Sequence, residues 1–195
     1  MTAVPRIVMF TRWPTAGLAK TRLIPAVGPE GAATIHRRLT ERTLDVIKAA
    51  GLTPEVWFTG ATIKAFSAWL GADADYVDQG DGDLGVRLAR AARAAPVILM
   101  GSDAPDLSAA HLRGAVAALN QHPAVIGPAE DGGYWLLGLR APSPWAFDDV
   151  PWSTDRVFAI TVNRFRERGM EPRILATLAD LDTPDDLRRW PDLIA

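Results

Sequence analysis

The amino-acid sequence predicts an α/β fold, namely a Rossmann-like three-layer α/β/α arrangement with a mostly parallel, mixed sheet. Short apolar runs alternate along the chain with stretches of helical periodicity. Such alternation is typical of parallel strands that are covered by helices on both faces. Near residues 125 and 134, two apolar runs follow one another with no helix between them. This break in the alternation predicts that the sheet is mixed.

The first half of the chain is predicted to contain four strands, each a short apolar run, and three helices. The predicted strands are 7–10, 56–59, 76–77 and 97–100. The predicted helices are 32–49, 62–70 and 84–94. Gly51 closes the first of these helices, and Ile63, Phe66, Trp69 and Leu70 form one apolar face of the second.

The second half is predicted to add three helices and three strands. Ser108 is a plausible N-cap for a helix that runs to about residue 119. Ser153 is expected to cap the next helix, which ends at Gly169, with Trp152 and Val157 at the spacing of a hydrophobic staple. The predicted strands are 125–126, 134–139 and 174–175, and Thr183-Pro184 is expected to open a short terminal helix.

Composition bounds the classes of function. The 195 residues fit one domain, 1–195, and 48% hydrophobic with 23% charged residues is ordinary for a globular protein. A net charge of -2 gives no reason to expect nucleic acid as a partner. The absence of cysteine excludes disulfides, thiolate zinc sites and a cysteine nucleophile, and the three histidines show no metal-ligand spacing. No apolar run reaches transmembrane length and no signal-peptide layout is visible, so we expect a cytoplasmic protein without a membrane partner.

The segment PVILMGSDAPDL, residues 96–107, is the most informative. The apolar run 97–100 predicts a strand that is buried on both faces. Asp103 follows it at the carboxyl end, where open α/β sheets bind ligands. A carboxylate there suits a divalent metal, Mg²⁺ or Mn²⁺, that also binds substrate phosphates. The alternative is that Asp103 and Asp106 only shape a turn.

The segment TRWPTAGLAKTRL, residues 11–23, forms a basic loop after the first predicted strand. It carries Arg12, Lys20 and Arg22, and Gly17 sharpens it. Such a loop can surround a polyphosphate while Lys20 and Arg22 neutralise its charge. A P-loop is excluded, because Ala19 and Pro14 stand where that motif needs glycine. The alternative is a solvated basic loop.

Two further turns are rich in glycine. In DQGDGDLGVRL, residues 78–88, glycines allow close approach of a flat ligand and Gln79 can hydrogen-bond a base edge, although glycine-rich turns are common. In GPAEDGGYWLLGL, residues 127–139, Glu130 and Asp131 stand in a turn between two strands. These acids suit a second metal ligand or a general base, and a plain hairpin is an equal alternative.

Two motifs near the end of the chain are interpreted mainly as structural. The helix cap and staple account for PWSTDRV, residues 151–157. The segment DLDTPDDL, residues 180–187, is interpreted as a helix start, and Asp182 is not expected to bind a metal.

Taken together and in this order, PTAGLAKTRL, GDLGVRL, GSDAPDL, EDGGYWLLGL, PWST and LDTPDDL resemble the DUF2064 family of small bacterial glycosyltransferase-like proteins, also called the arsenosugar-biosynthesis glycosyltransferase family. The resemblance extends from Arg6 to about Leu187. It implies membership of the nucleotide-diphospho-sugar transferase superfamily, with the GT-A fold. The same superfamily includes molybdenum-cofactor guanylyltransferase and phospholactate guanylyltransferase. Residues 101–106 read GSDAPD, with serine where many GT-A enzymes have the first acid of a DxD motif.

The resemblance implies that Lys20 and Arg22 hold phosphates, that the 79–87 turn contacts base or ribose, and that Asp103 is the metal-binding acid. We therefore expect a glycosyltransferase that uses a nucleoside-diphosphate sugar and a small-molecule acceptor. Asp131 and Lys20 are the expected catalytic residues, and Asp103 and Asp131 the expected metal ligands. The expected nucleotide-binding residues are Thr11, Gly17, Lys20, Arg22, Gln79, Gly85, Arg87 and Ser102. An aromatic acceptor wall is expected among Trp135, Trp145, Phe147 and Trp152.

Two alternatives stay open. One is a nucleotidyltransferase that releases pyrophosphate, and the other is a nucleotide-binding protein without catalysis. The sequence does not identify the base, the sugar or the acceptor, and it leaves room for a homo-oligomer.

Overall fold

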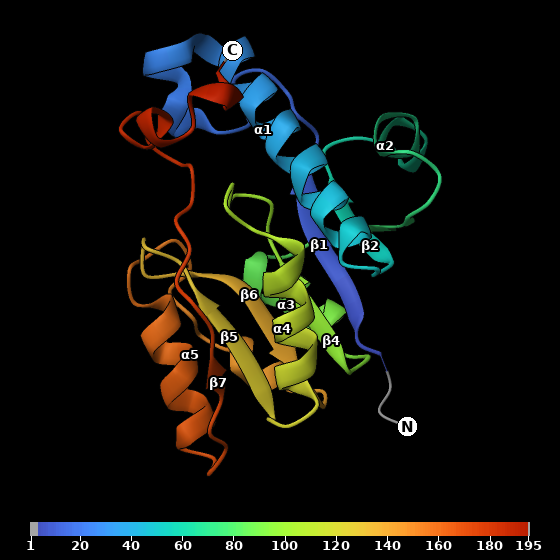
Figure 1. Ribbon diagram of the computed structural model, residues 1–195, viewed down its shortest axis with the longest axis vertical. Coiled ribbons are helices and arrows are strands. Elements are labelled where there is room, and N and C mark those ends of the chain that lie inside the picture. Colours follow the sequence, from blue (N-terminus) through green and yellow to red (C-terminus); the bar gives the residue numbers. More distant parts are fainter. Residues whose placement is uncertain (1–3, 195) are drawn as a thin grey trace.

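The computed structural model describes residues 4–194. It contains a seven-stranded sheet with the strand order β3-β2-β1-β4-β6-β5-β7 (Figure 1). Strand β6 runs antiparallel to its neighbours β4 and β5, and the other strand pairs are parallel. The predicted fold class, a mostly parallel mixed sheet of Rossmann type, is confirmed.

The elements follow the alternation in the sequence. The strands are β1 (Arg6–Arg12), β2 (Pro54–Thr59), β3 (Asp75–Asp78), β4 (Val97–Met100), β5 (Ala124–Pro128), β6 (Tyr134–Leu139) and β7 (Arg173–Ile174). The α-helices are α1 (Ile24–Ala49), α2 (Ile63–Leu70), α3 (Leu84–Ala91), α4 (Ala109–Leu119) and α5 (Val157–Arg166). Short 3-10 helices are η1 (Thr21–Leu23), η2 (Pro144–Phe147), η3 (Asp186–Arg189) and η4 (Pro191–Leu193).

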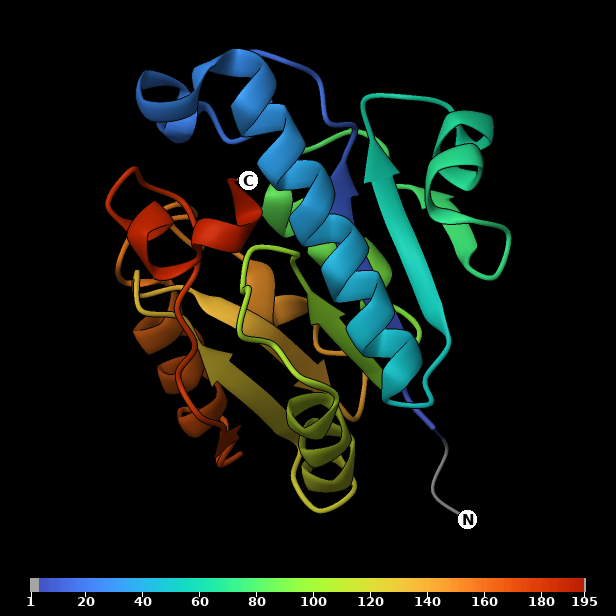
Figure 2. The same cartoon turned by 45° about the horizontal axis from the view of Figure 1, so that its top comes forward.

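The sheet separates two apolar cores, because successive strand residues point to opposite faces. In β1, Ile7 and Met9 pack with α1, α2 and α4 on one face, and Val8 packs with α3 and α5 on the other. Figures 1 and 2 show α1 and α4 over the same face of the sheet. The central strand β4 is buried along its whole length, as predicted for residues 97–100.

Helix α1 begins at Ile24, earlier than the predicted start at residue 32. Pro25 lies in its first turn, where a proline costs no hydrogen bond. Gly28 (φ 73°) then kinks the helix before Pro29. The sequence pattern predicts the helix only from residue 32, whereas in the structure these prolines and this glycine already start and kink it.

Helix α5 begins at Val157 and its N-cap residue is Arg156, so the prediction that Ser153 caps it is wrong. Ser153 has a left-handed backbone (φ 64°) and belongs to the preceding turn. The amide of Phe158 in the first turn donates to the carbonyl of Gly132 at 2.9 Å. A contact with the β5–β6 turn therefore positions the start of this helix.

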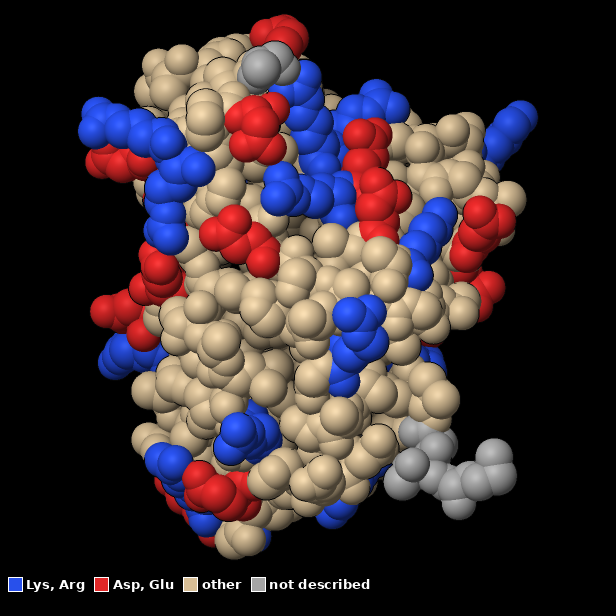
Figure 3. All heavy atoms as spheres, in the orientation of Figure 1, with Lys and Arg blue, Asp and Glu red and all other residues tan. Residues whose placement is uncertain are grey.

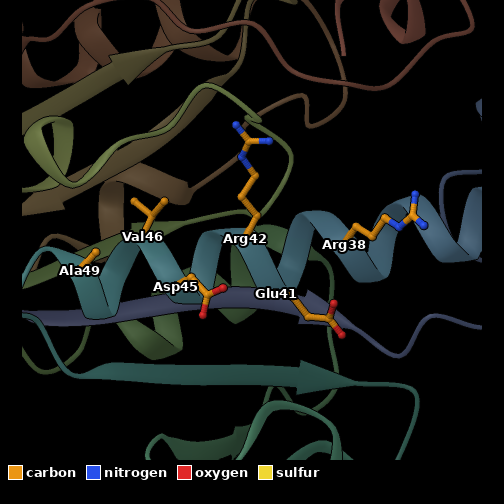
Figure 4. Close-up of a pocket in the computed structure, with 6 residues that line it drawn as sticks. All are labelled: Arg38, Glu41, Arg42, Asp45, Val46 and Ala49. Carbon is orange, nitrogen blue, oxygen red and sulfur yellow. The ribbon is translucent and has the colours of Figure 1, made fainter. Parts of the chain in front are cut away.

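The C-terminal segment runs from β7 to the N-terminal half of α1 (Figure 2) and ends in η3 and η4. The short helix expected after Thr183-Pro184 is thus present as the 3-10 helix η3, which begins at Asp186. Trp190 and Leu193 join an apolar cluster with residues of α1 such as Ile35 and Leu39. From the solvent side of α1, drawn in Figure 4, Arg38 donates to the carbonyl of Leu193 at 2.9 Å. The segment 190–193 is thus packed against α1 and hydrogen-bonded to it.

Charges of both signs are intermixed where the C-terminal segment meets α1, on the face shown in Figure 3. Within residues 4–194, no helix combines the length and the apolar character needed to cross a membrane.

A partly buried ion pair joins β1 to β2. Arg6 Nη2 lies 2.6 Å from Glu55 Oε1, and the indole of Trp57 donates to the same oxygen at 2.6 Å. Partial burial opposes ionisation of Glu55, but the hydrogen bonds from Arg6 and Trp57 outweigh it and hold the pKa of Glu55 below its ordinary value.

We expect Glu55→Gln to lower the free energy of unfolding at pH 7 by about 1–2 kcal/mol. Because the folded-state pKa of Glu55 is depressed, its stabilisation is present above the ordinary glutamate pKa and is lost as the pH falls through the folded value. Urea unfolding at pH 7 and at pH 3 measures this difference, with Glu30→Gln at an exposed glutamate as control. A difference between wild type and Glu55→Gln that is the same at both pH values would contradict the assignment.

Candidate functional site

A pocket of about 390 Å³ opens beside the carboxyl ends of β1 and β4 and the start of β6. The order of the strands reverses between β1 and β4, and segments on both sides of this point line the pocket. They are the end of β1, helix α3, the loop after β4, the β5–β6 turn, residues 151–157 and residues 178–180. Open α/β sheets bind ligands at such a switch point. Among the lining residues the charged ones are Asp103, Asp131 and Asp180, and none is Lys or Arg.

Lys20 joins the basic loop to the acid that follows β4. Its ammonium lies 2.8 Å from Asp103 Oδ1 and 3.7 Å from Asp182 Oδ1, and it donates to the carbonyl of Leu181. Lys20 has a left-handed backbone (φ 47°), and its side chain is only 6% exposed. Arg22 pairs with Asp182 at 2.6 Å. The structure thus brings Lys20 to Asp103 and Arg22 to Asp182, and the two members of each pair lie far apart in the sequence.

Asp103 is ionised in this arrangement. Desolvation tends to raise the pKa of Asp103, but attraction to Lys20 and the hydrogen bond from it outweigh this effect, and the pKa lies below its usual range. The side chain is 53% exposed, so it stays accessible from the pocket. Because Asp103 is accessible to solvent, its carboxylate can release the Lys20 ammonium and bind a ligand cation instead.

Asp131 and Asp180 place further negative charge at the pocket. The amide of Gly133 donates to Asp131 Oδ1 at 2.8 Å, which orients the carboxylate in its turn. At Gly132 (φ 86°) a Cβ would meet the backbone of Asp155 at 2.1 Å, so the turn needs glycine there. Burial and repulsion by Asp131 raise the pKa of Asp180 to about 6.

Thr11 and Ser102 contribute their side chains to a buried hydrogen-bond network beneath the site. Thr40 Oγ1 lies 3.1 Å from Thr11 Oγ1 and 3.3 Å from Ser102 Oγ. His36 Nε2 lies 3.0 Å from the carbonyl of Arg12, so this nitrogen carries the proton. Burial lowers the pKa of His36. These side chains connect α1 to the ends of β1 and β4. Because the side chains of Thr11 and Ser102 are used in this network, these residues would bind a nucleotide through their backbone atoms.

Gln79 is engaged by the protein itself. Its amide group donates to the carbonyls of Thr11 at 2.9 Å and Trp57 at 2.8 Å. Arg87 Nη1 lies 3.3 Å from Gln79 Oε1, whereas Arg87 Nε is a buried donor without a partner in the described chain. Gln79 would therefore have to break its present hydrogen bonds in order to bond a base edge. The Nε–H group of Arg87 is a donor that no described residue of the protein accepts from.

The two predicted glycines differ in their surroundings. Gly17 (φ 81°) is exposed in the basic loop, where its backbone conformation favours glycine. At Gly85, a Cβ would lie 2.7 Å from Trp152 Nε1 and 3.0 Å from the carbonyl of Phe147. The group that approaches Gly85 closely is thus the indole of Trp152, and not a flat ligand as the sequence suggested.

The expected aromatic wall is formed in part. Trp135 and Trp152 line the pocket. Trp145 packs instead against Phe165, with ring centroids 4.8 Å apart, and Phe147 lies in the core beneath α3 and α5. Tyr134, which was not among the predicted wall residues, also lines the pocket.

From the sequence, Asp180 has no expected role in the site, and Asp182 is not expected to bind a metal. Both belong to an extended segment that continues past β7, where the amide of Leu178 donates to Pro128 and that of Leu181 to Asp103. Side chains two residues apart share a face of extended chain, so the acids at 180 and 182 were a usable signal. Their proximity to Asp103 depends on this long-range pairing, which the local pattern does not reveal.

The donor set fits a divalent cation only in part. Within residues 4–194 no three Asp, Glu or His side chains lie close enough to form a complete metal site. Mg²⁺ is commonly held by one or two carboxylates together with substrate phosphates, however. The exposed Asp103 and the repulsion between Asp131 and Asp180 are consistent with such a shared site.

Comparison with protein families gives one match. The model of the family described as "Uncharacterized protein conserved in bacteria (DUF2064)" matches residues 43–154. Comparison with curated proteins finds no match.

Several solved structures share the fold. One, from Desulfovibrio desulfuricans G20, carries the provisional name nucleotide-diphospho-sugar transferase; it is 28% identical, with 98% of this chain and 97% of that chain covered and a TM-score of 0.88. Rv0371c from Mycobacterium tuberculosis H37Rv in complex with manganese is 24% identical, with 96% and 98% covered and a TM-score of 0.55. A CMP:2-keto-3-deoxy-manno-octonic acid synthetase complexed with CTP is 16% identical, with 98% of each chain covered and a TM-score of 0.57. The latter two likenesses concern the fold alone.

Proposed function

The chain belongs to the bacterial DUF2064 family, and from this premise and the geometry of the site we propose that it is a metal-assisted glycosyltransferase with a nucleoside-diphosphate sugar as donor. The observation that carries the proposal is the position of Lys20, which lies between Asp103 and Asp182, where Asp103 lines a pocket whose charged lining residues are all acids. The similarity to the protein from Desulfovibrio desulfuricans supports a transferase of nucleotide-activated groups.

In this proposal the donor's diphosphate lies beside Asp103. Lys20 and Arg22 turn from their carboxylate partners to the phosphate oxygens, which makes charge-assisted hydrogen bonds of comparable geometry. Asp103 would hold Mg²⁺ or Mn²⁺ together with the phosphate oxygens of the donor, and the cation would supply positive charge against the charge that develops on the leaving diphosphate. Arg87, whose buried Nε has no hydrogen-bond partner among the described residues, is the residue of the 79–87 turn that we propose contacts the nucleotide, although it does not line the pocket.

The transfer forms one carbon–oxygen bond, breaks another, and moves one proton. The hydroxyl oxygen of the acceptor attacks the anomeric carbon of the sugar. The bond from that carbon to the diphosphate oxygen breaks, and its electron pair leaves with the nucleoside diphosphate. Asp131 accepts the hydroxyl proton, because Gly133 fixes one of its oxygens and the carboxylate faces the pocket.

Nucleotidyl transfer is the second candidate. Its support is the fold shared with the CMP:2-keto-3-deoxy-manno-octonic acid synthetase complexed with CTP. In that reaction the same cations would stabilise a displaced pyrophosphate. The lack of Lys or Arg among the pocket-lining residues argues against a small phosphorylated acceptor there.

Paired product measurement separates the two reactions. The protein is incubated with nucleoside-diphosphate sugars or with nucleoside triphosphates, each with MgCl₂ or MnCl₂ and a panel of acceptors. We expect release of nucleoside diphosphate from the sugar donors. Pyrophosphate that appears in step with acceptor consumption would replace the glycosyltransferase proposal with the nucleotidyltransferase one.

A further inference from the structure

We propose that the pocket contains an acceptor subsite that selects an uncharged molecule with a planar apolar face and excludes acceptors that carry phosphate or carboxylate. That the bound molecule is an acceptor rests on the proposed function, whereas the preference for an uncharged planar molecule follows from the side chains that line the pocket. The subsite is the part formed by Phe10, Leu84, Leu88, Tyr134 and Trp152.

Apolar side chains from three separate elements form this subsite. Phe10 comes from β1, Leu84 and Leu88 from α3, and Tyr134 from β6. Leu84 is 43% exposed although it is large and apolar. An apolar side chain left partly open at a concave surface gains free energy when a ligand covers it.

Two aromatic rings give the subsite its shape. The rings of Tyr134 and Trp152 stand nearly perpendicular, with centroids 6.4 Å apart and planes at 82°. Close contact with Gly85 holds the Trp152 indole against α3, and the amide of Trp152 donates to the carbonyl of Val150 at 2.8 Å. Tyr134 lines the pocket, and its hydroxyl is buried without a hydrogen-bond partner among the described residues. Rigid rings in this arrangement suit a planar partner.

Electrostatics decide the charge of the occupant. The charged residues of the pocket wall are Asp103, Asp131 and Asp180. Lys20 and Arg22 do not line the pocket and are paired with Asp103 and Asp182. Because three carboxylates line the pocket, an anionic acceptor would be repelled there.

A pair of probes with the same ring system tests the selection. We expect 2-naphthol to bind the wild-type protein at least ten times more tightly than 2-naphthyl phosphate, in NMR titrations without nucleotide. Leu84→Ala removes apolar contact area and should weaken 2-naphthol about fivefold. Val86→Ala is the matched control, because Val86 is 49% exposed on the same helix and does not line the pocket. It should leave binding unchanged.

The charge contribution has its own variant pair. Asp180→Asn should reduce the preference for 2-naphthol over 2-naphthyl phosphate by threefold or more. Asp185→Asn makes the same charge change at an exposed position outside the pocket and should not alter the preference.

Several results would overturn the inference: equal affinity for both probes, no binding of either, or equal effects of Leu84→Ala and Val86→Ala. None of these measurements uses a nucleotide. If 2-naphthol binds as expected but nucleotide sugars do not, the subsite stands and the glycosyltransferase proposal fails. If nucleotide sugars bind and the probes show no selection, the subsite fails and the proposed function stands.

Discussion

Replacing Asp103 with asparagine is expected to lower turnover by about a hundredfold or more, because one carboxylate then no longer helps to hold the cation that faces the leaving diphosphate. The metal-dependent part of nucleotide affinity should disappear as well. The fold should persist, since the side chain is half exposed and the carbonyl of Asp103 still accepts from the Leu181 amide. Calorimetric titration of a nucleoside diphosphate with and without MnCl₂ measures the affinity.

Asp106→Asn is the matched control in the same loop. Asp106 accepts a hydrogen bond from the Trp190 indole at 2.9 Å and does not line the pocket. Its variant is expected to leave nucleotide affinity unchanged. Wild-type affinity for metal and nucleotide in Asp103→Asn would show that Asp103 only shapes a turn.

Lys20→Ala is expected to weaken the binding of nucleoside diphosphates by about ten- to a hundredfold. A charge-assisted contact to phosphate contributes about 1.5–3 kcal/mol, which corresponds to such a change in the dissociation constant. The affinity for the bare nucleoside should stay nearly constant, since it has no phosphate for the ammonium to contact.

Titrations of the nucleoside and its diphosphate to wild type and variant provide the measurement. Lys48→Ala is the control, because Lys48 lies at the end of α1, with its nearest carboxylate, that of Asp73, 3.9 Å away. Equal losses for nucleoside and diphosphate in Lys20→Ala would mean that the lysine supports the loop and does not hold phosphate.

The fold could be predicted well from the sequence because buried strands and amphipathic helices have strong local patterns. The run 97–100 is a strand buried on both sides, and the break in alternation near 125 and 134 is the antiparallel pair β5–β6. Ser108 caps α4 as predicted. The errors fall where long-range contacts decide, as at Ser153, where the β5–β6 turn positions the start of α5.

The candidate site could be predicted only as separate motifs. Each motif has a local signature, but its partners come from distant parts of the chain. The bond from Lys20 to Asp103 and the proximity of Asp182 depend on the extended C-terminal segment. The bonds of Gln79 to Thr11 and Trp57 likewise depend on the order of strands in the sheet, so a residue that looked free to read a base is held by backbone carbonyls.

The measurement that tests the central claim most directly is the melting temperature of the wild-type protein with a panel of nucleoside-diphosphate sugars, each with and without MnCl₂. A ligand present at 100 times its dissociation constant stabilises the folded state by about 2.7 kcal/mol. For a chain of this size that corresponds to a rise of about 5–10 °C. We predict a rise of this order for at least one sugar donor, dependent on the metal and absent in Asp103→Asn. No rise with any nucleotide sugar, or the same rise in Asp103→Asn, would contradict the account.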